Sequence, residues 1–120
     1  MSDEDILRAL RSLRAPIRQG EYDLHALVGK ALTDAGLAHA HEAVLGPRCR
    51  IDFLCGDVGI EIKRGRVERA KVLSQLARYA SSGRVRALIL VSERTVSLPD
   101  AVGGVPLHFI CLNRLWGIAL

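Results

Sequence analysis

Apolar and polar residues change their spacing several times along the chain, and each spacing predicts a different element. Near the N-terminus, an acidic start in which Ser2 can act as a helix cap leads into apolar residues at helical spacing. These apolar residues are Ile6, Leu7, Leu10 and Leu13. We therefore expect an N-terminal helix within residues 1–16, with Pro16 as its stop.

The clearest helical pattern begins at Glu21 and ends at Gly36, a residue that favours helix termination. Its apolar members recur at three- and four-residue intervals: Leu24, Leu27, Val28, Ala31, Leu32 and Ala35. Because Glu21 lies three residues before Leu24, its carboxylate is expected on the buried side of the first turn rather than in open solvent.

The pattern then changes to short segments rich in branched residues, at 41–45, 49–55 and 58–63. Gly46-Pro47 and Gly56-Asp57 separate them and favour tight turns. The segments therefore predict a three-stranded antiparallel meander.

Beyond the meander, helical spacing returns over residues 68–81, and the continuously apolar run at 87–91 is typical of a strand covered on both faces. Residues 98–106 are rich in Gly and Pro and are expected to form a loop before a last strand at 107–112. The order helix, helix, three strands, helix, strand, strand predicts an α/β fold with a central mixed β-sheet flanked by helices.

A two-residue turn at Gly56-Asp57 fixes the register of the hairpin that it joins. One face then holds three apolar pairs and is expected on the core: Cys55–Val58, Phe53–Ile60 and Ile51–Ile62. The other face holds the pairs Leu54–Gly59, Asp52–Glu61 and Arg50–Lys63.

The pairing of Asp52 with Glu61 places two carboxylates side by side, which destabilises a sheet unless a cation lies between them. Oxygen ligands favour Mg²⁺ or Mn²⁺, which take one or two carboxylates and leave other positions to water and phosphate. Lys63 follows Glu61 on the same face, where its ammonium can orient a nucleophilic water, contact a phosphate, or both. This set predicts hydrolysis of a phosphodiester. The alternative is a solvated sheet face with alternating polar residues.

The composition, with 49% hydrophobic and 25% charged residues among 120, is that of a globular chain about one domain long, and it excludes disordered and fibrous classes. Lys and Arg number 17 against 13 Asp and Glu, so a polyanion is a plausible partner, although charge of this size is also common in small proteins. Three cysteines without C-x-x-C spacing, an acidic start and no apolar run of about 18 residues together predict a cytoplasmic protein without a membrane span.

The segment R-I-D-F-L followed by G-I-E-I-K resembles the signature of the PD-(D/E)XK nuclease superfamily, which includes restriction endonucleases and archaeal-type Holliday junction resolvases. The resemblance implies a restriction-endonuclease-like core over residues 20–112, with a tail at 113–120. It also implies that Asp52, Glu61 and Lys63 form the site of a metal-dependent endonuclease acting on DNA, with RNA left open. Ile51 stands where the family's name has Pro, a residue that supplies no ligand.

The resemblance also suggests supporting residues. Many members carry a Glu on the helix before the meander, which Glu21 matches as a third metal-binding carboxylate, and Gln75 stands where related proteins often have Gln. A homodimer is expected by analogy, because cutting two strands takes two sites.

Basic residues beside this set are candidates for contacting phosphates. Lys71, Gln75 and Arg78 lie at helical intervals and form one polar stripe. The other candidates for contacting nucleic acid are Arg50, Arg64, Arg66 and Arg69. A solvated basic loop is the alternative for the arginines that follow Lys63.

Other interpretations stay open. The same fold can serve as a nucleic-acid-binding module without catalysis, or as a structural subunit in which the Trp116 tail forms an interface. Glu21 and Gln75 are also ordinary helix residues, and the proximity of His39, His41 and Glu42 is more simply incidental than a second metal site.

Overall fold

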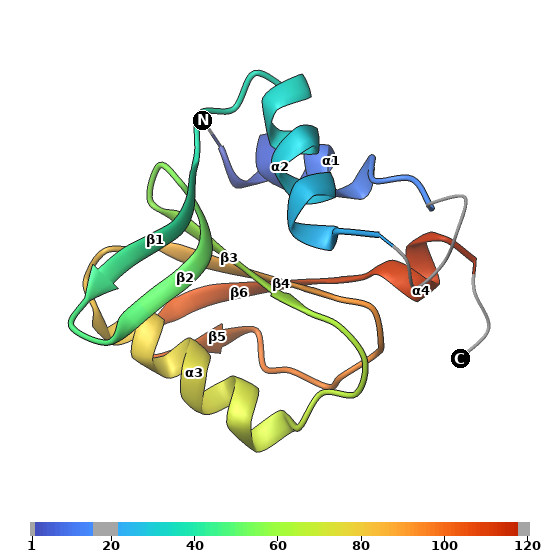
Figure 1. Ribbon diagram of the computed structural model, residues 1–120. Coiled ribbons are helices and arrows are strands. Elements are labelled where there is room, and N and C mark those ends of the chain that lie inside the picture. The colour runs from blue at the N-terminus through green and yellow to red at the C-terminus, as the bar shows by residue number, and fades with distance from the viewer. Residues whose placement is uncertain (1, 16–21, 118–120) are drawn as a thin grey trace.

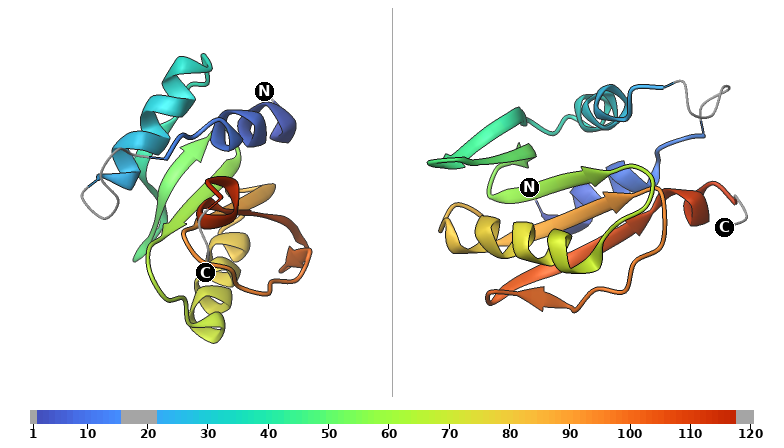
Figure 2. Two further views of the ribbon diagram at one scale, coloured as in Figure 1. Left: turned by 90° about the vertical axis from the view of Figure 1, so that its right-hand side faces the viewer. Right: turned by 60° about the horizontal axis from the view of Figure 1, so that its bottom comes forward.

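The computed structural model describes residues 2–15 and 22–117, which form a six-stranded sheet with helices on both faces (Figure 1). The elements in chain order are α1 (Asp3–Arg11), α2 (Leu24–Asp34), β1 (Ala40–Gly46), β2 (Cys49–Cys55), β3 (Val58–Lys63), α3 (Arg69–Ser81), β4 (Ala87–Ser92), β5 (Ala101–Val102), β6 (Val105–Cys111) and α4 (Leu112–Leu115). Helices α1 and α2 cover one face of the sheet, and α3 covers the other (Figures 1 and 2). The expected α/β fold with a mixed sheet flanked by helices is confirmed.

The strands lie in the order β1-β2-β3-β4-β6-β5. The first three form the predicted antiparallel meander, and β4 then pairs in parallel with β3 after the crossover through α3. Every residue of β4 is buried, which confirms the expectation of a central strand covered on both faces. The loop at 64–68 joins the end of β3 to the start of α3, and Lys63, Glu68 and Lys71 line one hollow there.

The first helix begins as predicted, with Ser2 and Asp5 forming a capping box, but it ends at Arg11 rather than near Pro16. Leu13 stays buried although it lies past the helix, so the apolar spacing continued beyond the helical backbone. Pro16 itself is outside the described residues.

Helix α2 begins at Leu24, because the side chain of Asp23 accepts a hydrogen bond from the Ala26 N–H and caps the helix there. The sequence had placed the start at Glu21, which lies outside the described residues. Gly36 follows the helix with a positive φ of 72°, as expected for a terminating glycine.

The hairpin turn at Gly56-Asp57 and the pairs Cys55–Val58, Leu54–Gly59 and Phe53–Ile60 have the predicted register. The prediction was wrong for Ile51, which was expected to face Ile62 beside Phe53. Phe53 packs in the core under α1 and α2, whereas Ile51 packs under α3. The ladder between β2 and β3 ends at Phe53–Ile60, so the strict alternation on which the prediction depended does not continue past Asp52.

The C-terminal part also differs from expectation. The segment predicted as a loop at 98–106 contains β5, and β6 begins at Val105 because the chain reverses at Gly103-Gly104, two glycines with positive φ. The predicted tail at 113–120 includes most of α4. Trp116 is partly buried against the core, and its ring Nε1 donates to the Leu13 carbonyl at 3.0 Å. Residues 118–120 lie outside the described chain.

Within residues 2–15 and 22–117, no helix combines the length and the apolar character that crossing a membrane requires.

Gly59 is a position where the packing under α3 leaves no room for a side chain. A Cβ at this position would lie 2.5 Å from Ile51 Cδ1 and 3.0 Å from Leu88 Cδ2, and both side chains are fully buried. We therefore expect Gly59→Ala to lower the free energy of unfolding by about 1–3 kcal/mol through overpacking, measured by urea denaturation. Gly46→Ala, which meets no atom within 4 Å, serves as the control and should be nearly neutral.

Candidate active site

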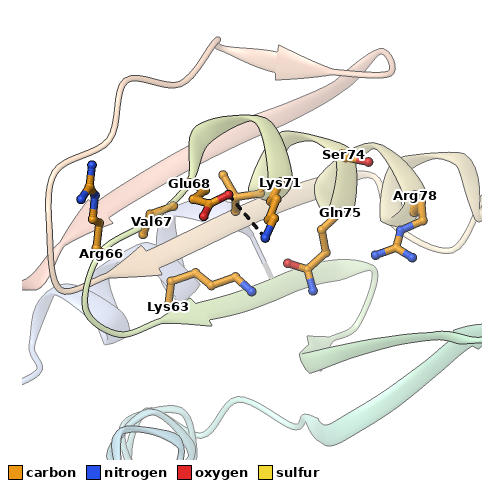
Figure 3. Close-up of a pocket in the computed structure, with 9 residues that line it drawn as sticks. Lys63, Arg66, Val67, Glu68, Lys71, Ser74, Gln75 and Arg78 are labelled. Carbon is orange, nitrogen blue, oxygen red and sulfur yellow. Dashed lines mark ion pairs between the residues drawn. The ribbon is translucent and has the colours of Figure 1, made fainter.

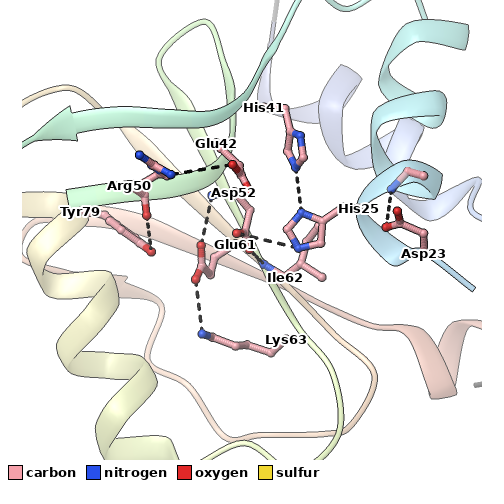
Figure 4. A network of polar contacts seen from close by, with 11 residues as sticks. Asp23, His25, His41, Glu42, Arg50, Asp52, Glu61, Ile62, Lys63 and Tyr79 are labelled. Carbon is pink, nitrogen blue, oxygen red and sulfur yellow. Dashed lines mark hydrogen bonds and ion pairs between the residues drawn. The ribbon is translucent and has the colours of Figure 1, made fainter. Parts of the chain in front are cut away.

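The predicted carboxylate pair lies where β2 and β3 separate. Past Phe53–Ile60 the backbone ladder ends, and side chains take over its hydrogen bonds. The Ile62 N–H donates to Asp52 Oδ2 at 2.7 Å, and the Asp52 N–H donates to Glu61 Oε1 at 3.3 Å (Figure 4). Each carboxylate therefore bonds a backbone N–H that the interrupted ladder leaves without a strand partner.

Glu61 is a buried acid, with only 4% of its side chain exposed. Burial and the nearby charge of Asp52 raise the pKa of Glu61 to about 7, and Lys63 opposes this shift. The Lys63 Nζ lies 3.4 Å from Glu61 Oε2. One ammonium therefore faces a site with two acidic groups, an arrangement that attracts a further cation.

The site opens toward solvent on the side of Lys63. The side chains of Asp52 and Lys63 are 24% and 32% exposed, while Glu61 lies beneath them. Lys63 also lines a hollow of about 660 Å³ between the end of β3 and α3 (Figure 3). A ligand in this hollow would therefore meet the ammonium of Lys63 before the buried carboxylate.

The structure adds His25, which the sequence analysis did not single out. Its Nε2 lies 4.0 Å from Asp52 Oδ1, and its Nδ1 lies 3.0 Å from His41 Nε2 (Figure 4). One of these two ring nitrogens must carry the shared hydrogen. No sequence signal identifies His25, because its proximity to Asp52 depends on how α2 packs over the sheet.

Tyr79 of α3 is a second residue that the sequence analysis missed as part of the site. Its hydroxyl donates to the Arg50 carbonyl at 3.1 Å, and burial together with the negative charge of Glu61 raises its pKa. Tyr79 therefore ties α3 to the part of β2 that precedes Asp52. In the sequence it was visible only as an apolar position of the helix.

The predicted polar stripe on α3 faces the hollow beside Lys63. Gln75, Lys71 and Arg78 all line it, together with Arg66 from the preceding loop (Figure 3). The structure thus brings four of the predicted supporting residues to the same side of the sheet as Lys63.

Arg64 and Arg69 are engaged elsewhere. Arg64 Nε lies 3.3 Å from Glu93 Oε2, its NH1 donates to the Tyr22 carbonyl, and its guanidinium lies over the Tyr22 ring. Arg69 Nε donates to the Ser97 carbonyl at 2.8 Å. These contacts hold loops in place, so neither guanidinium is as available to a phosphate as the sequence suggested.

Glu93 is the centre of the network that holds Arg64. Burial alone would raise its pKa, but hydrogen bonds from the Tyr22 hydroxyl and the Gly65 N–H, with the charge of Arg64, bring that pKa below its usual value. The network fixes the chain directly after Lys63.

The donors for a hard cation are Asp52 and Glu61. Among the described residues, no group of three or more His, Cys, Asp or Glu side chains is placed to hold a metal ion. Two carboxylates nevertheless fit Mg²⁺ or Mn²⁺, which commonly keep water in their remaining positions. The third predicted carboxylate, Glu21, lies outside the described residues.

His39, His41 and Glu42 have separate partners. His39 Nδ1 lies 2.9 Å from the Leu37 carbonyl oxygen, His41 faces His25, and Glu42 lies 3.9 Å from Arg50. The three side chains do not converge on one point.

No protein-family model, curated protein or solved structure matches this chain. What supports a function is therefore the arrangement of Asp52, Glu61 and Lys63 and the basic hollow beside them.

The raised pKa of Glu61 makes stability depend on pH. Its folded-state pKa of about 7 exceeds the ordinary 4.5, so the charged form costs stability as pH rises through this window. Without divalent cations, Glu61→Gln should therefore stabilise the protein at pH 8.5 by on the order of 3 kcal/mol, because each pKa unit between 4.5 and about 7 corresponds to about 1.4 kcal/mol. At pH 4.5 the gain should vanish.

Urea denaturation in chelator from pH 4.5 to 8.5 measures this difference. Glu68→Gln makes the same chemical change at the exposed N-cap position of α3 and is the matched control. If Glu61→Gln raises the free energy of unfolding equally at pH 4.5 and pH 8.5, the raised pKa of Glu61 is contradicted.

Proposed function

We propose that the chain is a metal-dependent endonuclease with a restriction-endonuclease-like core that hydrolyses phosphodiester bonds in DNA. The observation that carries this proposal is the carboxylate pair itself. Asp52 and Glu61 lie on adjacent strands and are joined through backbone N–H groups, with Lys63 at 3.4 Å from the buried member. Burying Glu61 next to another acid opposes folding, and a bound cation would offset this cost.

In this proposal Asp52 and Glu61 hold one Mg²⁺ or Mn²⁺. When bound, such an ion supplies positive charge to a phosphate oxygen and acidifies water. The raised pKa of Glu61 is consistent with a cation site, because a metal charge would return this carboxyl to its ionised form.

The chain's own groups then have separate tasks. Asp52 keeps Oδ1 available, because its Oδ2 accepts from the Ile62 N–H. Lys63 supplies N–H donors to the attacking water or to a non-bridging phosphate oxygen. Negative charge grows on that phosphate oxygen as the water oxygen bonds to phosphorus and the leaving oxygen departs. Gln75 lines the hollow beside Lys63 and can donate an amide N–H to the bound nucleic acid.

The remaining parts of the proposal rest on the resemblance and on composition. Glu21 would be a third carboxylate, DNA is the expected substrate with RNA still open, and a homodimer would bring two sites to two strands. The cysteines Cys49, Cys55 and Cys111 are free thiols, which is consistent with a reducing cytoplasm.

A nucleic-acid-binding module without catalysis is the second candidate. The observation that favours it is that Asp52 and Glu61 already bond backbone N–H groups and Lys63, so the fold can keep both carboxylates without a metal. Such a module would bind nucleic acid in a salt-dependent way that is indifferent to chelator.

Cleavage assays with Mg²⁺ and Mn²⁺ on branched, duplex and single-stranded DNA test the nuclease. Asp52→Asn and Lys63→Ala should each lower the cleavage rate by about 100-fold or more, because the first removes a carboxylate that would hold the metal ion and the second removes the ammonium that would face the reacting phosphate. Chelation should abolish cleavage, and added Mn²⁺ should restore it. Glu21→Gln, assayed in parallel, tests the third carboxylate.

Lys30→Ala provides the matched control, since it removes an exposed lysine of α2 that pairs with Asp34. It should cleave at the wild-type rate. Full activity in the Asp52→Asn and Lys63→Ala proteins would sink the nuclease proposal, and binding without cleavage by the wild-type protein would favour the binding module.

A further inference from the structure

Two hollows on the α3 side of the molecule join into one groove. The first, of about 660 Å³, lies beside Lys63, and the second, of about 440 Å³, lies between α3 and the turn that joins β1 to β2. Gln75 and Arg78 line both hollows, so the two are continuous across this part of the helix. We call the combined surface, from Arg66 through Arg78 to Arg48, the α3 groove.

The charge of the α3 groove is strongly positive. Its cationic lining residues are Arg48, Arg50, Lys63, Arg66, Lys71 and Arg78. Of the described residues, Glu68 is the one acid that lines either hollow, and it lies 3.4 Å from Lys71. Arg50 also has an acid nearby, Glu42 at 3.9 Å. The other cationic residues that line the groove still give it an excess of positive charge. A polyanion fits this surface.

The groove has few means of reading bases. Tyr79 is the aromatic residue among those lining the two hollows, and it is 3% exposed with its hydroxyl on the Arg50 carbonyl. Stacking on exposed aromatic side chains is what gives many single-strand binders their base contacts, and no such side chain lines the hollows within residues 2–15 and 22–117. Contacts to phosphate, which carry no sequence information, are what this lining offers.

The size of the groove favours one strand. Each hollow has a volume within the range of about 300–1,000 Å³ that holds one small molecule, so each has room for about one or two nucleotides of a single strand. Lys63 lies at the edge where the groove meets the carboxylates, so a strand lying in it would pass over the proposed reaction centre.

We propose that the α3 groove binds one strand of a polynucleotide through its sugar-phosphate backbone, without regard to base identity and without a divalent cation. One part of this inference rests on the proposed function: that the bound strand continues from the groove toward Lys63. Binding itself depends on Arg66, Lys71, Arg78 and Arg48, which stand apart from the carboxylates. DNA and RNA share the chemistry that this groove recognises.

Fluorescence anisotropy in chelator tests the proposal with labelled 20-nucleotide strands of dT, dA and rU and a mixed-sequence duplex. The three single strands should bind with affinities within about threefold of one another, and each should bind more tightly than the duplex. Lys71→Gln and Arg78→Gln should each weaken binding about threefold or more and reduce the slope of log affinity against log salt by about 0.7. Both side chains are exposed, so both variants should fold.

Arg8→Gln is the matched control, because Arg8 is an exposed arginine on α1, on the opposite face of the sheet. It should leave affinity and slope unchanged. The proposal is overturned if Arg8→Gln weakens binding as much as Arg78→Gln does, if the duplex binds more tightly, or if one base is preferred by more than tenfold. Absence of binding in chelator at 50 mM salt overturns it as well.

The same samples separate this inference from the proposed nuclease. Binding to the α3 groove without cleavage in Mg²⁺ or Mn²⁺ would leave the groove intact and reject the nuclease. Cleavage that Lys71→Gln and Arg78→Gln leave unchanged, together with unchanged binding, would keep the nuclease and reject the groove.

Discussion

The architecture of the site depends on one constraint: two backbone N–H groups must find acceptors where β2 leaves β3. The Asp52 carboxylate accepts from the Ile62 N–H, and the Glu61 carboxylate accepts from the Asp52 N–H. This solution brings two acids together and buries one of them, which is why the pKa of Glu61 rises and why Lys63 lies beside it. The hydrogen bonds that complete the fold thus also create the local excess of negative charge.

Local periodicity predicted much of the fold because it depends on neighbours in the sequence. The turn at Gly56-Asp57 fixed the hairpin register as far as Phe53, and continuous burial identified β4 as central. The failure at Ile51 has a physical cause, since alternation holds only while the ladder continues, and side chains replace the ladder at Asp52. The short β5 lies in a segment whose Gly and Pro residues favour a loop, and α1 ends at Arg11 although the apolar spacing continues to Leu13.

The site was only partly predictable for a different reason. Asp52, Glu61 and Lys63 could be identified from one hairpin, and the stripe of Lys71, Gln75 and Arg78 from one helix. His25 and Tyr79 approach the carboxylates only when helices pack on opposite faces of the sheet. That packing involves contacts between distant parts of the sequence. The local spacing of apolar and polar residues does not predict such contacts. For the same reason the sequence could not show that Glu93 holds Arg64.

The contacts of Tyr22 with Glu93 and of Leu13 with Trp116 join residues that are 71 and 103 positions apart. They close the layer formed by α1 and α2 against the end of the sheet. During synthesis, helices α1 and α2 are made before Glu93 and Trp116, the residues whose contacts fix them. The apolar layer under these helices therefore stays incomplete until the chain has been made as far as Trp116.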